Sequence, residues 1–220
     1  MEPSAIKILI EQATLLHNSE PRSTGSTYTA FLTSWVAWEA LRTRFIRVVI
    51  HHKGWLLKDA DKVLAQQRIG STRHAASALG NVGLLDPDQW SGKSGKGWKA
   101  LRDIEPLRNR IVHGFKSIEP DRIHAATSVV LCLLSDHEWL SSVPIVDAAK
   151  TKERILVGPL LNPRRSSKLT QQRQLEELAK VMKVDLSSGV RPLPSRVHLA
   201  KLATDAGFKK NHGDCDSKAL

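Results

Sequence analysis

The chain has 220 residues, enough for one ordinary domain with an appendage or for two small domains, and 41% of them are hydrophobic, which suffices for a core. Lys and Arg number 33 against 22 Asp and Glu, giving a formal net charge of +11. Residues 141–220 contribute +7 of it, with 15 basic and 8 acidic side chains. Such a surface favours polyanionic partners, nucleic acid first, although basic side chains also serve solubility.

The sequence lacks the features of several classes of protein. Cys132 and Cys215 are the two cysteines, one in an apolar run and one in a polar tail, and they form neither a disulfide framework nor a zinc spacing. The start of the chain lacks the basic and apolar regions of a signal peptide, and no apolar run reaches the roughly 18 residues of a membrane span. We therefore expect a cytoplasmic protein without a membrane partner.

Helical periodicity governs the first 140 residues. It predicts helices over residues 4–17, 27–52, 56–68, 71–81, 98–113 and 121–140. The strongest is 27–52, where apolar side chains recur every three or four residues: Phe31, Trp35, Trp38, Leu41, Phe45 and Val49. We interpret its two tryptophans as core or dimer-interface anchors rather than as platforms for base stacking. The prediction is an all-α bundle over residues 1–140.

Residues 91–97, with the sequence SGKSGKG, predict a flexible loop. They resemble a phosphate-binding loop only superficially, because Pro87 stands where that motif needs its first glycine and no apolar strand precedes them. Lys93 and Lys96 remain candidates for contact with an RNA backbone. In the helix that follows, Pro106 predicts a kink or a restart.

The texture of the sequence changes beyond Val143, where prolines separate short basic stretches. We expect residues 141–220 to form a small basic accessory region with two helices, 169–183 and 195–206, and a mobile end. Arg164 and Arg165 are its candidate RNA-binding residues. The two helices could alternatively form the reading unit of a nucleic-acid-binding regulator, but the connection between them is too long and proline-rich for a convincing helix-turn-helix.

The candidate chemistry is concentrated in residues 107–114, LRNRIVHG. The nine histidines form no metal set, and no Ser or Cys has the surroundings of a nucleophile, so we expect neither a metal nor another cofactor. On a regular helix Asn109 and His113 lie about 40° apart, whereas Arg108 and His113 lie about 140° apart. Both can therefore serve one phosphate only if the helix ends near Gly114 or a second subunit contributes its own pair.

Arginine and histidine suffice to cleave RNA, because the 2′-hydroxyl of the substrate is the nucleophile. Histidine titrates near neutrality and can move the protons, while guanidinium stabilises charge on the phosphoryl oxygens. DNA lacks that hydroxyl and is not cut in this way. These residues could thus support a metal-independent endoribonuclease that leaves a 2′,3′-cyclic phosphate, although Arg, Asn and His near a helix end also serve as caps and solvated charges.

Residues 107–114, followed by a proline-started helix and preceded by the long helix with Ser34, Trp35, Trp38 and Glu39, resemble the HEPN superfamily. The resemblance covers roughly residues 1–140 and rests on Arg108, Asn109 and His113. It implies a HEPN-like helical bundle, a homodimer in which two motifs meet, and a ribonuclease used as a toxin or anti-phage effector. A neutralising antitoxin or a defence-system protein would then be a partner.

Glu39 is the fourth candidate catalytic residue, and Arg110 a further RNA-binding one. The superfamily often has an acidic residue followed by basic ones on an earlier helix, and Glu39 with Arg42 and Arg44 resembles that, although Thr43 splits the basic pair. A carboxylate on a mostly apolar face needs a cation. We expect Arg108 or His113 to supply it, with an intrahelical pair to Arg42 as the alternative. A non-catalytic HEPN-like module that binds RNA or protein is the rival to the enzyme.

Overall fold

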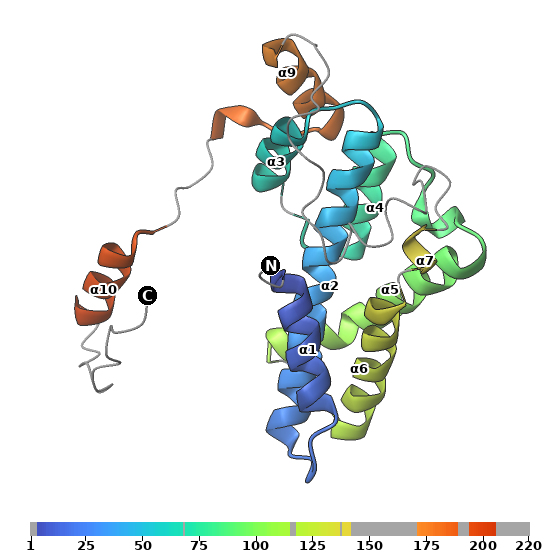
Figure 1. The fold of residues 1–220 in the computed structure, drawn as a ribbon, viewed down its shortest axis with the longest axis vertical. Helices are drawn as coiled ribbons and strands as arrows, with labels where there is room; N and C mark the ends of the chain where they lie inside the picture. Colours follow the sequence, from blue (N-terminus) through green and yellow to red (C-terminus); the bar gives the residue numbers. More distant parts are fainter. Residues whose placement is uncertain are drawn as a thin grey trace. The chain divides into compact units, whose positions relative to one another are not determined.

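The secondary structure of the chain is helical wherever the structure describes it. The computed structural model describes residues 4–67, 69–114, 118–136, 138–141, 171–188 and 194–205. Every regular element within these ranges is a helix, which confirms the all-α prediction, and none of them is long and apolar enough to cross a membrane. The chain divides into two compact units, residues 1–187 and residues 188–220, and the first holds the helical bundle (Figure 1).

Serine caps begin the first two helices. α1 spans Ala5–His17, and the hydroxyl of Ser4 accepts a hydrogen bond from an amide of its first turn. α2 spans Thr24–His52 and starts with a capping box, in which the side chains of Ser23 and Ser26 each accept from the other's backbone N–H. These contacts satisfy amide groups that have no partner inside a helix, so the starts are encoded locally.

α2 is the central helix of the first unit. It packs against α1, α3 (Leu57–Gln66), α4 (Thr72–Asn81) and α6 (Pro120–Ser135), and is therefore buried around much of its circumference (Figure 1). Its largest apolar side chains are 2% exposed or less: Phe31, Trp35, Trp38, Leu41, Phe45 and Ile46. Both tryptophans are therefore core residues, which is one of the two roles that their spacing predicted.

α5 begins earlier than the sequence predicted. It spans Gly92–Val112, so the expectation of a flexible loop over residues 91–97 was wrong. The glycines there allow close approach: a Cβ on Gly95 would lie 1.9 Å from a backbone carbonyl oxygen, and one on Gly97 would lie 2.8 Å from the Trp139 ring. A glycine-rich stretch predicts flexibility because the sequence does not show which neighbours pack so closely that only glycine fits.

α5 continues through Pro106 as one helix, although the proline predicted a kink or a restart. Pro106 lies on the exposed side of the helix. Water can therefore replace the hydrogen bond that a proline removes.

A cluster of tryptophans joins α5 to the helices beside it. The ring of Trp38 in α2 lies 6.0 Å from that of Trp98 in α5 and 5.7 Å from that of Trp139 in α7 (Glu138–Ser141). The Trp139 indole N–H donates to the Leu133 carbonyl of α6 at 2.7 Å, so the ring is satisfied as well as buried. This cluster fixes the N-terminal half of α5.

α9 belongs to the first unit. It spans Gln171–Met182 and packs against α3, where Leu178, Ala179 and Met182 join the core with exposures of 0%, 4% and 1%. The compact unit therefore extends to residue 187 and not only to residue 140, because the apolar face of this helix has a partner in the bundle. α10 (Arg196–Asp205) lies in the second unit, so both helices predicted for the tail are present.

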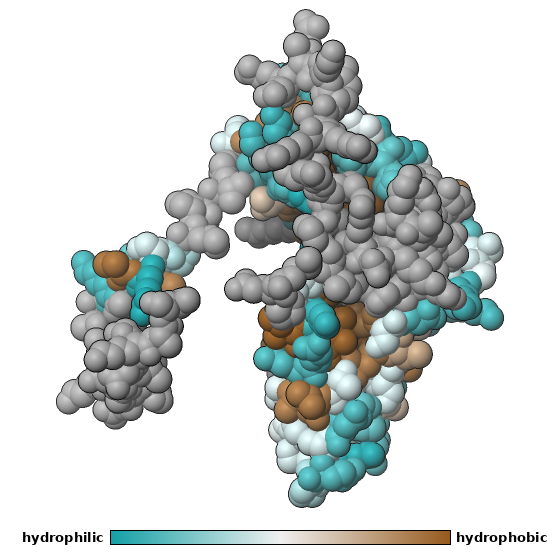
Figure 2. All heavy atoms as spheres, viewed as in Figure 1, coloured by the Kyte–Doolittle hydropathy of each residue, from teal (hydrophilic) through white to brown (hydrophobic). Residues whose placement is uncertain are grey.

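The surface of the first unit mixes the two kinds of side chain. Hydrophobic patches lie among hydrophilic ones at the end of the unit formed by α1, α2 and α6 (Figure 2). Large apolar side chains on these helices that remain exposed include Ile8, Leu15, Val36 and Val129. Single exposed apolar residues are common on monomeric proteins, and only a contiguous group indicates a binding surface.

Gly95→Ala tests whether the start of α5 depends on close approach. The new Cβ would collide with the carbonyl oxygen of Trp90, and we expect the free energy of unfolding to fall by about 1–3 kcal/mol. Gly80→Ala is the matched control, because that glycine lies on α4 with nothing within 4 Å of an added Cβ. It should raise stability by about 0.4–1 kcal/mol. Urea unfolding followed by circular dichroism measures both, and an unchanged Gly95→Ala protein would contradict the close approach.

Candidate functional site

The candidate site lies at the C-terminal end of α5. The helix closes with the His113 amide donating to the Asn109 carbonyl at 3.0 Å and the Gly114 amide donating to the Ile111 carbonyl at 3.2 Å. His113 is the C-cap, and Gly114 follows in the left-handed region with φ +65°. A residue with a side chain adopts that conformation only with strain, so the glycine that predicted the helix end also produces it.

Arg108 is held by a carboxylate from α2. Its Nη2 lies 3.2 Å from Oε1 of Glu39, and the two side chains are 25% and 30% exposed. The same oxygen accepts a hydrogen bond from the Trp35 indole N–H at 3.1 Å. Glu39 is thus oriented from its own helix and orients Arg108 in turn. Of the partners considered for Glu39, the structure selects Arg108.

Asn109 is the next member of the group. Its Oδ1 accepts a hydrogen bond from Nη1 of Arg108 at 3.2 Å, although the residue itself is exposed. With the oxygen engaged, the Nδ2 amide is the end of the side chain that can donate to a ligand. The guanidinium therefore has Glu39 on one terminal nitrogen and Asn109 on the other.

His113 lies at the end of the helix, one turn beyond Asn109. It is exposed at the helix end, and the ion pair and hydrogen bond that join Glu39, Arg108 and Asn109 do not involve its imidazole. Positions 108 and 113 lie about 140° apart around a regular helix. One chain therefore brings Glu39, Arg108 and Asn109 together, and His113 follows one turn beyond Asn109.

Arg42 is a charged residue of this region whose role the sequence did not show. It is 1% exposed, its Nη2 donates to the Ile69 carbonyl at 2.8 Å, and its guanidinium carbon lies 5.9 Å from the centre of the Trp38 ring. Burial lowers the pKa of Arg42, while the nearby carboxylates of Glu39 and Glu105 act in the opposite direction. Glu39 therefore lies between two cations, Arg42 and Arg108.

Glu105 connects this region to α4. Both of its carboxylate oxygens accept from the Thr72 amide, at 3.0 and 3.2 Å, at the first residue of that helix. A negative charge at a helix N-terminus is favourable, so α5 holds the start of α4 in place. Glu105 lies one turn before Asn109 in the sequence. The sequence could not predict its contact with Thr72, because Thr72 is far away along the chain.

The candidate RNA-binding residues are distributed along α5. Lys93, Lys96 and Arg110 are all exposed. Lys96 and Arg110 lie on the same side of the helix, roughly 20 Å apart at a rise of 1.5 Å per residue. Arg164 and Arg165 lie outside the described residues. In the described part of the chain, no three His, Cys, Asp or Glu side chains are grouped so that they could hold a metal ion.

Comparisons with protein-family models, with curated proteins and with solved structures found no match for this chain. The all-helical fold stands on the structure, while the resemblance to the HEPN superfamily rests on the residues around Arg108 and His113 alone.

Because Glu39 lies between two cations, we expect neutralising Glu39 and neutralising Arg108 to lower the free energy of unfolding by different amounts. Glu39→Gln removes a negative charge that favours the buried Arg42, and we expect a loss of about 1–2 kcal/mol, below the roughly 3–5 kcal/mol of a fully buried broken pair because Glu39 is 30% exposed. Arg108→Gln removes one partner of a half-exposed ion pair and should cost about 0–1 kcal/mol. Urea unfolding of the two variants measures the difference, and a larger loss for Arg108→Gln would contradict this account.

Proposed function

We propose that this chain is a metal-independent endoribonuclease that cleaves RNA by attack of the substrate's own 2′-hydroxyl. The observation that supports it best is the arginine at position 108, oriented on two sides by Glu39 and Asn109 beside the histidine that ends the same helix. An arginine that served only as a solvated charge would not need two partners. A preoriented guanidinium is the group that stabilises a charged phosphoryl transition state.

The roles follow from the chemistry of each side chain. His113 is the general acid or base that accepts the 2′-hydroxyl proton or protonates the leaving oxygen. Arg108 stabilises the charge on the phosphoryl oxygens, and Asn109 positions the phosphate through its amide N–H groups. Glu39 is a positioning residue, because it acts through Arg108. The product carries a 2′,3′-cyclic phosphate.

A homodimer is part of the proposal. Because positions 108 and 113 lie about 140° apart around a helix, a second copy would bring its histidine to the arginine of the first. Two exposed apolar side chains adjoin the Arg108–Glu39 pair: Val112, one turn beyond Arg108, is 52% exposed, and Val36, one turn before Glu39, is 49% exposed. Apolar side chains beside a charged site favour burial against a partner.

RNA would be held mainly by positive charge. Lys93, Lys96 and Arg110 line the exposed side of α5, and the basic residues beyond 141, Arg164 and Arg165 among them, add a large share of the net charge. A cytoplasmic toxin or anti-phage effector, restrained by an antitoxin or a defence-system protein, is the biological setting that the resemblance implies.

Cleavage of a mixed RNA pool in EDTA tests the activity. We expect the wild-type chain to cut RNA, and His113→Ala to cut it about 10²–10⁴-fold more slowly, since it lacks the proton-transfer group. His74→Ala is the matched control, because His74 is an exposed histidine on α4 outside the site. Cyclic-phosphate termini on the products identify the mechanism.

Two outcomes would count against this proposal. If His113→Ala cleaved as fast as wild type, the assignment of His113 would be wrong. If the wild-type chain bound RNA without cutting it, a non-catalytic RNA-binding module would be the better description. Arg108→Lys keeps the positive charge but loses the guanidinium that Glu39 and Asn109 hold. Loss of cutting in this variant would show that the guanidinium itself is required and not only its charge.

The contribution of the second unit to RNA binding is measurable through salt. Residues 188–220 hold six Lys and Arg against three Asp, a net +3. Removing them should flatten the dependence of log Kd on log salt by up to about 0.7 for each phosphate of a single-stranded RNA that the shortened chain leaves unneutralised. Gel shifts at rising salt provide the slope. A slope equal to that of the full chain would place the phosphate contacts on the first unit.

A further inference from the structure

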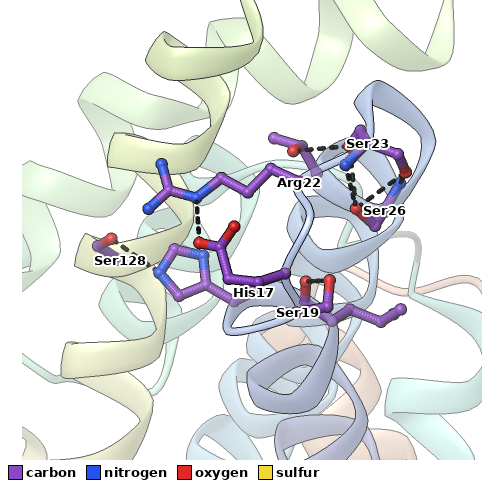
Figure 3. Close-up of polar contacts among 9 residues, drawn as sticks. His17, Ser19, Arg22, Ser23, Ser26 and Ser128 are labelled. Atoms are coloured by element: carbon purple, nitrogen blue, oxygen red, sulfur yellow. Dashed lines mark hydrogen bonds and ion pairs between the residues drawn. The ribbon is translucent and has the colours of Figure 1, made fainter.

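Two histidines stack where α1 meets α6, away from the site described above. His17 is the last residue of α1, and its ring lies 3.9 Å from that of His124 in α6, with 22° between the ring planes. Nε2 of His17 lies 3.0 Å from the hydroxyl oxygen of Ser128, and Figure 3 shows this contact bridging the two helices. Since α1 also packs on α6, the pair lies at a joint between elements.

The hydrogen bonds around His17 suit a neutral ring and not a charged one. An imidazolium has an N–H on both nitrogens, and each buried N–H needs an acceptor. Nε2 has Ser128, but Nδ1 is buried without a partner among the described residues. The Ser128 hydroxyl is also 3.2 Å from the His124 carbonyl, to which it can donate while accepting from Nε2. Protonation therefore buries an unsatisfied donor at Nδ1.

The charges around His17 also oppose a second positive charge. His124 is stacked on it, and Arg22 follows in the connection to α2, where its Nε pairs with Glu20 at 3.5 Å (Figure 3). The first two turns of α2 contain no charged side chain. Glu11 on α1 is paired with Lys7. On α6, the exposed Asp121 and Arg122 precede His124 and offset each other in charge.

Burial, His124 and Arg22, in that order, lower the pKa of His17 from its ordinary 6.5. The unfolded chain then takes up the proton more readily than the folded one. Stability contributed by this site is fully present above about pH 6.5 and is lost as the pH falls below it.

We propose that the stacked pair His17–His124 is an acid-sensitive latch: it holds the end of α1 against α6 at neutral pH and releases it when the His17 imidazole takes up a proton. The device is independent of the proposed ribonuclease site, since it uses residues of other helices. Mildly acidic conditions would loosen the attachment of α1 to the rest of the unit.

The pH dependence of unfolding in the full chain tests the latch. Between pH 7.5 and 5.5 the unfolding constant of the wild-type chain should rise more steeply than that of His17→Gln, by up to about tenfold per pH unit for one proton. His124→Gln should flatten the dependence in the same direction by removing the stacked charge. His74→Gln, an exposed histidine on α4, should leave it unchanged. Comparing slopes keeps the test valid if a substitution also lowers stability at every pH.

NMR titration of the imidazole protons and hydrogen exchange of residues 5–17 complete the test. We expect His17 to titrate below the ordinary imidazole value of 6.5, and protection of α1, corrected for intrinsic exchange, to fall toward pH 5.5 in the wild-type chain and not in His17→Gln. Equal slopes for wild type and His17→Gln, or a His17 that titrates at or above 6.5, would overturn the proposal.

Discussion

A positive charge buried at Arg42 in the central helix is the constraint on which the arrangement around α5 depends. Its guanidinium is desolvated, with one carbonyl partner and a tryptophan face beside it. A charge in such a position is tolerable only if carboxylates lie close by. The negative charges of Glu39 and Glu105, on two different helices, favour the charged form of Arg42. Each of these carboxylates also has a second function, at Arg108 and at the start of α4 respectively.

The orientation of Arg108 is therefore a consequence of the core. Glu39 is held by the Trp35 indole within α2, and Trp35 is itself buried. In the N-terminal half of α5, the contact between Trp38 and Trp98 sets the position of this helix against α2. Glycines there also let the helix approach its neighbours. A side chain placed by rigid helices and packed rings is preorganised, which is what the stabilisation of a transition state requires.

The helices themselves are encoded locally, and most of them could be read from the sequence. The period of apolar residues in 27–52 predicted α2, and Pro120 and Gly114 indicated a helix start and a helix end that the structure contains. Capping and periodicity depend on residues within one or two turns, so no knowledge of the fold is needed. The proximity of Arg108 to Asn109 could likewise be predicted without the fold, because the two residues are adjacent in the chain.

Features that join distant parts of the chain were decided by the tertiary structure. The sequence by itself determined the helices, the order LRNRIVHG and the opposed directions of Arg108 and His113. It left Arg108, His113 and Arg42 as candidate partners of Glu39, predicted a loop over residues 91–97 and ended the bundle at residue 140. The structure paired Glu39 with Arg108, packed the glycines of α5 against Trp90 and Trp139, and placed α9 on α3. The reason is physical: a helix forms from its neighbours in sequence, but a partner or a close contact depends on surfaces that meet only in the folded chain.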